Sequence, residues 1–203
     1  MIEIDYFMSH GSPWTFLGHM RLERIVKKFD VKLNLYPVNY GEIFPISGGL
    51  PVSKRPPQRQ KIRLQELNRW GEFLKIKLVP QPKFFPSKSL LPSLIIIAAK
   101  IKKTDKEFIL ANNIMSALWI KELDVDDEKI LSKILDETGL NSNDILSFGK
   151  STECREILDQ YTNQAIKSDV FGAPTFIIED QIYWGQDRLD FVERHLAELT
   201  KTE

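Results

Sequence analysis

The chain has 203 residues, of which 42% are hydrophobic, and its 28 Lys and Arg side chains balance 28 Asp and Glu. This length suffices for one large domain or for one domain with an inserted lobe. The balanced charge gives no global electrostatic case for nucleic acid or an acidic membrane surface as a partner. The single cysteine, Cys154, excludes a disulfide framework and suits a reducing compartment.

Neither a secretory signal nor a membrane segment is predicted. The first five residues lack the basic and apolar regions of a signal peptide. The most apolar run, 90–99, contains Pro92 and is far too short to span a membrane. We therefore expect a cytoplasmic protein with no membrane partner.

The chain opens with a strand–helix–strand unit. Residues 2–8 alternate in side-chain character and predict a strand. Ser12 is placed as the N-cap of a helix that has Pro13 at its first position and continues to Phe29. Alternation over 31–35 predicts a second strand. Two strands joined by a helix form a parallel unit.

The middle of the chain is predominantly helical. Residues 43–60 contain Pro45 and the pair Gly48–Gly49, and we predict a loop there. Helical periodicity follows over 60–73, 90–102, 106–123, 128–138, 142–148 and 152–168.

The last part of the chain changes character. Two short apolar runs, 175–178 and 182–184, predict a hairpin, and a final helix follows Gly185. We therefore predict an α/β fold, with a thioredoxin-like βαβ–ββα core and a large all-helical insertion. The predicted division is a thioredoxin-like domain of residues 1–58 and 166–203 and an inserted helical domain of residues 59–165.

The motif Ser12-Pro13-Trp14-Thr15 follows the first strand, where a thioredoxin-type redox protein carries Cys-x-x-Cys. Hydroxyl residues occupy both cysteine positions, so a two-thiol redox centre within one chain is impossible. A helix N-terminus favours an anion such as a thiolate, and the Ser12 hydroxyl can donate a hydrogen bond to it. Ser12 is therefore our catalytic candidate and an organic thiol its ligand. The alternative is a Ser-Pro helix start without chemistry.

Two motifs near the C-terminus are further candidates. Pro174 opens a strand where thioredoxin folds place a cis-proline beside the active-site helix, so Ala173 could pair with a peptide-like ligand. Gln186 and Asp187 stand at a helix start and could bind an α-amino-acid head group. The alternative for Asp187 is an ordinary N-cap.

Other residues give weaker signals. His10 is a candidate acid or base, or a bystander, and Trp119 is more typical of a core than of a site. A basic run could hold a substrate carboxylate, although a solvated basic face is the simpler interpretation: Lys54, Arg55, Arg59, Lys61 and Arg63. The histidines show no metal-ligand spacing with Cys154, and no phosphate-binding glycine loop is present, so we expect no metal.

Taken together, the motifs resemble those of the 2-hydroxychromene-2-carboxylate isomerase family, which belongs to the DsbA-like, kappa-class glutathione transferase group. The resemblance runs nearly from end to end. The motifs that carry it are Ser12-Pro13, Lys54 with Pro56-Pro57, Arg69-Trp70, Phe85-Pro86, Ala117-Leu118-Trp119, Phe171 to Phe176, and Trp184 to Leu189.

The resemblance implies the DsbA/kappa-class fold, glutathione as cofactor, a small-molecule substrate and a homodimer. Glutathione would lie with its thiolate at Ser12, its backbone paired with Ala173 beside Pro174, and its γ-glutamyl end near Gln186 and Asp187. The other implied ligands are Lys61 for glutathione, and His10, Lys54, Trp70 and Lys88 for the substrate.

Three positions depart from the family pattern, because Ser9 replaces an aspartate and Ser53 and Lys88 replace asparagines. In the family these positions lie around the substrate or the ends of the bound glutathione, so the resemblance does not identify the substrate of this chain. We expect an isomerase that works by reversible addition of a thiolate to an unsaturated carbon. The alternatives are a kappa-like transferase that conjugates electrophiles and a non-catalytic glutathione-binding protein.

Overall fold

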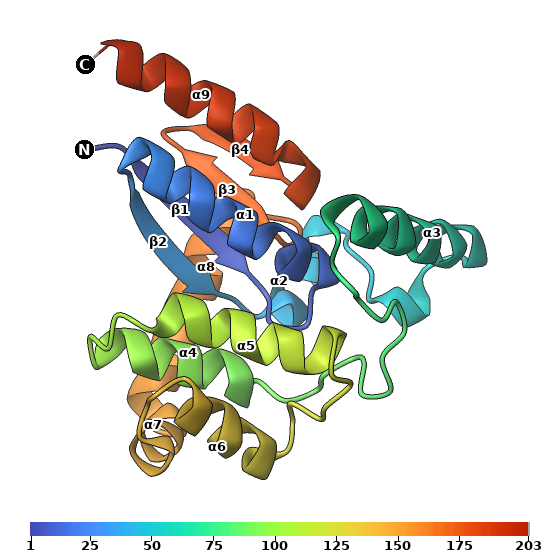
Figure 1. Ribbon diagram of the computed structural model, residues 1–203, viewed down its shortest axis with the longest axis vertical. Coiled ribbons are helices and arrows are strands. Elements are labelled where there is room, and N and C mark those ends of the chain that lie inside the picture. The colour runs from blue at the N-terminus through green and yellow to red at the C-terminus, as the bar shows by residue number, and fades with distance from the viewer. Residues whose placement is uncertain (203) are drawn as a thin grey trace.

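The computed structural model describes residues 1–202 and has the predicted α/β architecture, a thioredoxin-like core with a helical insertion (Figure 1). In chain order the elements are β1 (Glu3–Met8), α1 (Pro13–Phe29), β2 (Lys32–Pro37), α2 (Tyr40–Ser47), the 3₁₀ turn η1 (Val52–Lys54), α3 (Pro57–Leu74), α4 (Leu91–Ile101), α5 (Glu107–Trp119), α6 (Glu128–Glu137), α7 (Ser142–Gly149), α8 (Thr152–Lys167), β3 (Thr175–Ile178), β4 (Gln181–Trp184), η2 (Gln186–Arg188) and α9 (Leu189–Thr202).

The four strands form one sheet in the order β2–β1–β3–β4. β1 runs parallel to β2, whereas β3 is antiparallel to both β1 and β4. Helices α1 and α9 pack side by side on one face of the sheet, and α8 lies on the other face (Figure 1). This arrangement confirms the predicted βαβ–ββα order.

β1 is the central strand, and both of its faces are covered. Ile4, Tyr6 and Met8 are fully buried in the larger apolar core, as their alternation predicted. Phe7 points the other way and is also fully buried, in a smaller cluster that contains Ile43. A strand that helices cover on both sides needs apolar residues on both faces, which explains why Phe7 interrupts the polar face.

The insertion packs directly against the core. α4 is its centre, because residues 94–99 are buried and the helix packs against α5, α7, α8 and β2. The larger apolar core therefore contains residues from both predicted domains. The boundaries at 58/59 and 165/166 remain a proposed division. No helix within residues 1–202 is long and apolar enough to cross a membrane.

A buried histidine joins the core to the insertion. His19 of α1 bonds the carbonyl oxygen of Phe108 through Nε2 at 2.9 Å and the Tyr6 hydroxyl through Nδ1 at 3.0 Å. A carbonyl can only accept, so Nε2 carries the proton and Nδ1 accepts from Tyr6. Burial lowers the pKa of His19 to about 4, against the opposing effect of the Phe108 carbonyl. The side chain is therefore neutral at pH 7, with both ring nitrogens bonded.

The prediction of a loop over 43–60 is wrong at both ends. Residues 40–47 form α2, which begins after Asn39, whose side chain accepts from the N–H of Gly41, and ends at Gly48 with φ at +75°. α3 begins already at Pro57. Burial of Ile43, which is 1% exposed, stabilises α2 despite the helix-breaking Pro45 inside it.

Candidate active site

Ser12 is the N-cap of α1, as predicted. Its backbone is extended, with φ −90° and ψ 121°, and its Oγ accepts a hydrogen bond from the N–H of Thr15 at 3.2 Å. Pro13 has no N–H, and among residues 1–202 the N–H of Trp14 has no hydrogen-bond partner. The partly exposed start of α1 therefore offers a hydroxyl and an open amide to an anion.

The Ser12 hydroxyl also reaches the other end of the chain. Its Oγ donates to the carbonyl oxygen of Ala173 at 3.2 Å, across 161 residues of sequence. The Ala173–Pro174 peptide bond is cis, and the Pro174 carbonyl accepts from the N–H of Gly185 at 2.9 Å. Two separately predicted motifs therefore lie side by side, and the second is linked through Gly185 to the third.

The turn after β4 packs tightly on α1. Gln186 is 1% exposed, and its Oε1 accepts from Arg21 Nη1 at 2.7 Å, while its Nε2 is buried without a partner among residues 1–202. A Cβ placed on Gly18 would lie 2.9 Å from the Cβ of Gln186. Asp187 is exposed, and its one ion pair among residues 1–202 joins it to its neighbour Arg188, at 3.0 Å. The carboxylate of Asp187 is therefore open to a ligand, whereas the amide of Gln186 is buried and has only its Nε2 unpartnered among residues 1–202.

His10 is buried beside the Ser12 loop. Its Nδ1 lies 2.9 Å from Ser93 Oγ and its Nε2 2.9 Å from Ser87 Oγ, which donates its proton to Asp126 at 2.5 Å. Nε2 therefore carries the imidazole proton, and Nδ1 accepts from Ser93. Burial lowers the pKa of His10 to about 4, although the nearby Asp126 carboxylate opposes this. The predicted substrate residue His10 is thus neutral, with both ring nitrogens bonded.

Asp126 organises the loop that carries Lys88, and the sequence analysis did not find it. Burial alone would raise its pKa, but hydrogen bonds from the Ser87 hydroxyl and from the N–H groups of Lys88 and Ser89 lower it. The Lys88 side chain is exposed. The pairing joins segments 37–39 residues apart, so no local motif signals it.

Three other predicted ligands lie on η1 and α3. Lys54 and Lys61 are exposed, whereas Trp70 is half-buried and makes an edge contact with Phe73. Within residues 1–202 no hydrogen bond or ion pair joins these three side chains to the Ser12 loop. α3 nevertheless packs against α1, and Figure 1 shows it beside the N-terminal end of that helix.

Arg63 does not belong to a solvated basic face, which corrects the simpler interpretation of the basic run. Its side chain is only 6% exposed, and its guanidinium carbon lies 5.0 Å from the ring centre of Phe85. Burial, with the like charge of Arg55, lowers its pKa to about 10, so it stays protonated at pH 7. No described carboxylate pairs with it.

Within residues 1–202 no group of His, Cys, Asp and Glu could hold a metal ion. Cys154 is fully buried in the core, and burial raises the pKa of its thiol. A buried, protonated thiol is a poor nucleophile.

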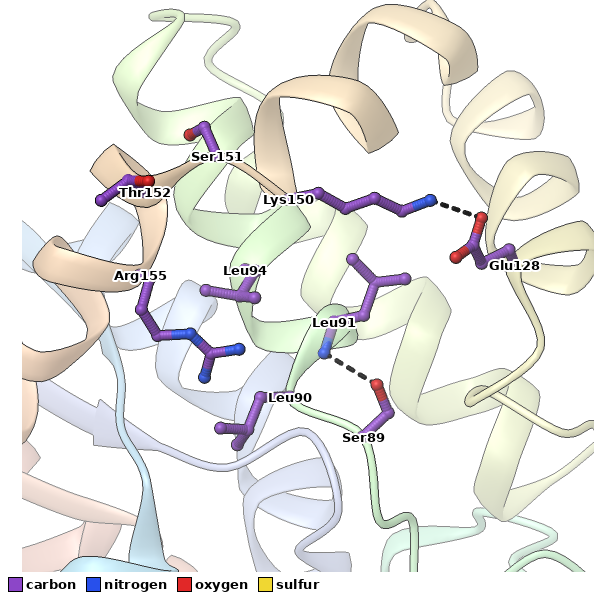
Figure 2. A pocket seen from close by; sticks show the side chains of 9 residues that line it. All are labelled: Ser89, Leu90, Leu91, Leu94, Glu128, Lys150, Ser151, Thr152 and Arg155. Atoms are coloured by element: carbon purple, nitrogen blue, oxygen red, sulfur yellow. Dashed lines mark hydrogen bonds and ion pairs between the residues drawn. The ribbon is translucent and has the colours of Figure 1, made fainter.

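A cavity of about 490 Å³ lies between the N-terminal ends of α4 and α8 (Figure 2). Leu90, Leu91 and Leu94 line it, and the Lys150–Glu128 ion pair, at 2.6 Å, borders it. It contains none of the residues that the sequence predicted as ligands.

The comparisons with known proteins agree with this geometry. Residues 3–197 match the family model of the DSBA-like thioredoxin domain. A 2-hydroxychromene-2-carboxylate isomerase from Sphingobium xenophagum is 24% identical over 196 residues, which cover 96% of this chain and 98% of that protein. Glutathione s-transferase kappa 2 from Caenorhabditis elegans is 22% identical, with 98% of this chain and 93% of that one covered.

Solved structures share the fold. A 2-hydroxychromene-2-carboxylate isomerase superposes with a TM-score of 0.83 at 21% identity, over 98% of this chain and 97% of that one. The cytosolic disulfide reductase DsbM from Pseudomonas aeruginosa, solved with GSH, superposes with a TM-score of 0.69 at 13% identity, over 98% of both chains.

Proposed function

This chain belongs to the DSBA-like thioredoxin domain family, and from that premise we propose that it is a glutathione-dependent cis-trans isomerase. Its proposed substrate is 2-hydroxychromene-2-carboxylate or a related unsaturated oxo-acid. Three relatives named for that isomerase match at least 95% of the chain at 23–24% identity, which supports this choice of reaction.

The observation that carries the proposal is the position of the Ser12 hydroxyl. It lies at the start of a helix, 3.2 Å from the carbonyl oxygen of Ala173, in a chain whose only thiol is buried far along the sequence. A thioredoxin-like site without its own cysteines suits a thiol that arrives with a ligand. The relative named for glutathione transferase and the fold neighbour solved with GSH support glutathione as that thiol.

The residues at the start of α1 fit the sulfur end of glutathione. When bound, glutathione supplies a thiolate that adds reversibly to an unsaturated carbon of the substrate, so that the former double bond can rotate before elimination restores it. The Ser12 hydroxyl turns from the Ala173 carbonyl and donates to the sulfur, together with the open N–H of Trp14. The partial positive charge of the helix end adds to both donors.

The remaining contacts hold the rest of glutathione. The backbone of Ala173, beside Pro174, pairs with the cysteinyl unit. The exposed Asp187 carboxylate binds the γ-glutamyl ammonium, and the unpartnered Nε2 of Gln186 is a further donor at the same end. Lys61 attracts a carboxylate of the tripeptide.

The substrate side is formed by loops and by α3. The exposed ammonium groups of Lys54 and Lys88 attract an acidic substrate, and Trp70 supplies an aromatic wall. His10 contributes by holding the Lys88 loop through Ser87, because its own ring nitrogens are bonded.

Calorimetry with glutathione tests the cofactor. We expect binding at millimolar concentration or below, and an absence of binding would overturn the proposal. Ser12→Ala should slow turnover and raise the pKa of the bound thiol by about 1 to 2, the equivalent of one charge-assisted hydrogen bond. The thiolate absorbance of the bound ligand measures this pKa.

A matched control separates capping from chemistry. Ser151 is the N-cap of α8 and accepts from the N–H of Cys154, as Ser12 does from Thr15. Ser151→Ala should leave the thiol pKa unchanged. Asp187→Ala should weaken glutathione binding more than it slows the chemical step, and equal binding by the variant would remove Asp187 from the site.

A kappa-like glutathione transferase is the second candidate, which the match to glutathione s-transferase kappa 2 favours. A transferase consumes glutathione with a chlorodinitrobenzene-type electrophile, whereas the isomerase returns it after turnover of the chromene carboxylate. Glutathione binding without either activity would identify a non-catalytic binding protein.

The proposal includes a cytoplasmic location, which the sequence led us to expect, and a homodimer, which the resemblance implies. Sedimentation equilibrium measures the oligomeric state directly, and a monomer at micromolar concentration would contradict it.

A further inference from the structure

Two buried hydrogen-bond donors lie in one aromatic cluster, which consists of Arg63, Phe85 and Trp119. The guanidinium carbon of Arg63 is 5.0 Å from the ring centre of Phe85 and 5.9 Å from that of Trp119, and the two rings are 5.0 Å apart. Arg63 is 6% exposed and Trp119 fully buried. Nη2 of Arg63 and Nε1 of Trp119 have no hydrogen-bond partner among residues 1–202.

The energetics of this cluster are unfavourable in the protein alone. A buried donor without a partner destabilises the fold, and a buried charge does so more strongly unless an opposite charge offsets it. The aromatic faces of Phe85 and Trp119 offset only part of the cost of burying the Arg63 charge. Arg55 adds a like charge nearby, and no carboxylate among residues 1–202 pairs with Arg63. The cluster thus retains a positive charge and open donors in a low-dielectric setting.

The cluster adjoins the Ser12 site. Phe85 precedes Ser87 by two residues, and Ser87 is hydrogen-bonded to His10, which precedes Ser12 by two. The helices that carry Arg63 and Trp119, α3 and α5, both pack on α1. Phe85 comes from residues 75–90, which contain no helix or strand, so an irregular segment covers the cluster on this side.

We propose that Arg63 and Trp119 bind the carboxylate of a planar unsaturated substrate, with the rings of Phe85 and Trp119 against its flat part. This inference rests on the isomerase function proposed above and assigns its substrate-anchoring residues. Both free groups are donors, so the ligand must present acceptors. One cation suits a singly charged carboxylate, which an arginine holds with two parallel hydrogen bonds.

The test uses trans-cinnamate, a planar unsaturated carboxylate, and cinnamamide, its neutral counterpart. We expect calorimetry to show that the wild-type protein binds cinnamate and rejects cinnamamide. Arg63→Met should weaken cinnamate binding roughly 10- to 100-fold, the loss of a charge-assisted hydrogen bond. Arg59→Met is the matched control, because Arg59 lies one turn earlier on α3 and is exposed. The Arg59→Met variant should bind cinnamate with the same affinity as the wild-type protein.

Thermal unfolding separates a ligand site from a structural contact. Arg63→Met removes an unpaired buried charge and should unfold at the same temperature as the wild type or higher. A second readout needs no arginine variant. The indole ¹⁵N–H resonance of Trp119, assigned with Trp119→Phe, should move downfield when cinnamate binds and stay fixed with cinnamamide.

Several results would overturn the inference: equal binding of cinnamate and cinnamamide, unchanged cinnamate affinity in Arg63→Met, or a fixed Trp119 resonance. If Arg63→Met weakens glutathione and spares cinnamate, the bound carboxylate belongs to glutathione and the substrate assignment is wrong. Failure of the wild-type protein to bind glutathione would refute the proposed function alone, because the cinnamate titrations contain no glutathione.

Discussion

Two buried polar clusters, one around His19 of α1 and one formed by Phe85, Arg63 of α3 and Trp119 of α5, differ in how their donors and acceptors are matched. At His19, the Tyr6 hydroxyl, both ring nitrogens and the Phe108 carbonyl all have partners. In the cluster of Arg63, Phe85 and Trp119, two donors have none among residues 1–202. The matched cluster joins the core to the insertion. The unmatched cluster does not stabilise the fold in this way, and its two open donors are available to the acceptor groups of a ligand.

Among the single substitutions, His19→Leu should have the largest effect on stability, because it leaves buried polar groups of this cluster without partners. The Tyr6 hydroxyl and the Phe108 carbonyl both lose their partner, which should cost roughly 2–5 kcal/mol of unfolding free energy. Urea denaturation measures this loss. The double variant Tyr6→Phe/His19→Leu removes one orphaned group and should recover part of it. A loss below about 1 kcal/mol would show that the matched cluster does not hold the two parts together.

The wild-type protein should lose stability as the pH falls from about 6.5 to about 4. Burial holds the pKa of both His10 and His19 at about 4 in the fold, below the usual value. The unfolded chain therefore binds more protons than the folded chain between these two pH values. Each histidine lowers the free energy of unfolding by about 3 kcal/mol as the pH falls through this range. Urea titrations at pH 7, 6, 5 and 4 measure the slope. His19→Leu should roughly halve it, and a flat profile would contradict the neutral assignment of both rings.

Asp126→Asn should have a smaller effect. The carboxylate accepts from Ser87 and from two backbone N–H groups, one of which would then face an amide N–H. We expect a loss of about 1–2 kcal/mol at pH 7. Because the fold lowers the pKa of Asp126, its contribution is present at neutral pH and is lost as the carboxylate becomes protonated. The difference between variant and wild type should therefore shrink at pH 3, which urea denaturation checks.

Ser12→Ala should have the smallest effect on stability, about 1 kcal/mol, the usual cost of a lost N-cap. Ser151→Ala should cost the same, because both hydroxyls cap a helix in the same way. Thermal unfolding compares the two variants. A much larger loss for Ser12→Ala would mean that its bond to Ala173 is mainly structural.

The features that local sequence encodes were predicted well. The Ser12 cap, the Pro13 helix start and the terminal hairpin depend on neighbouring residues only, and all three are confirmed. α2 was missed because Pro45 argued against a helix, although Asn39 and Gly48 marked its two ends. Tertiary burial of Ile43 outweighs the local penalty there.

The polar contacts of the candidate site depended on distant parts of the chain, and sequence reasoning found fewer of them. The position of Pro174 beside the Ser12 helix was predicted only because a known fold places those two motifs together, and the Ser12–Ala173 hydrogen bond itself was not predicted. Asp126 pairs with a loop nearly forty residues away, and no pattern within either segment marks that pairing. Arg63 has the spacing of an exposed basic face, since only the packing of Phe85 and Trp119 shows that it is buried.

Gly18 gives one more consequence of the packing between α1 and the turn after β4. A side chain at this position would press on Gln186, so the gap between the two ends of the proposed glutathione site depends on one absent methyl group. The absence of a side chain at Gly18 therefore allows this close approach, and the methyl group added by Gly18→Ala would force α1 and Gln186 apart. Gly18→Ala should therefore displace Gln186 from α1 and change the spacing of the proposed glutathione site through a residue that lies outside it.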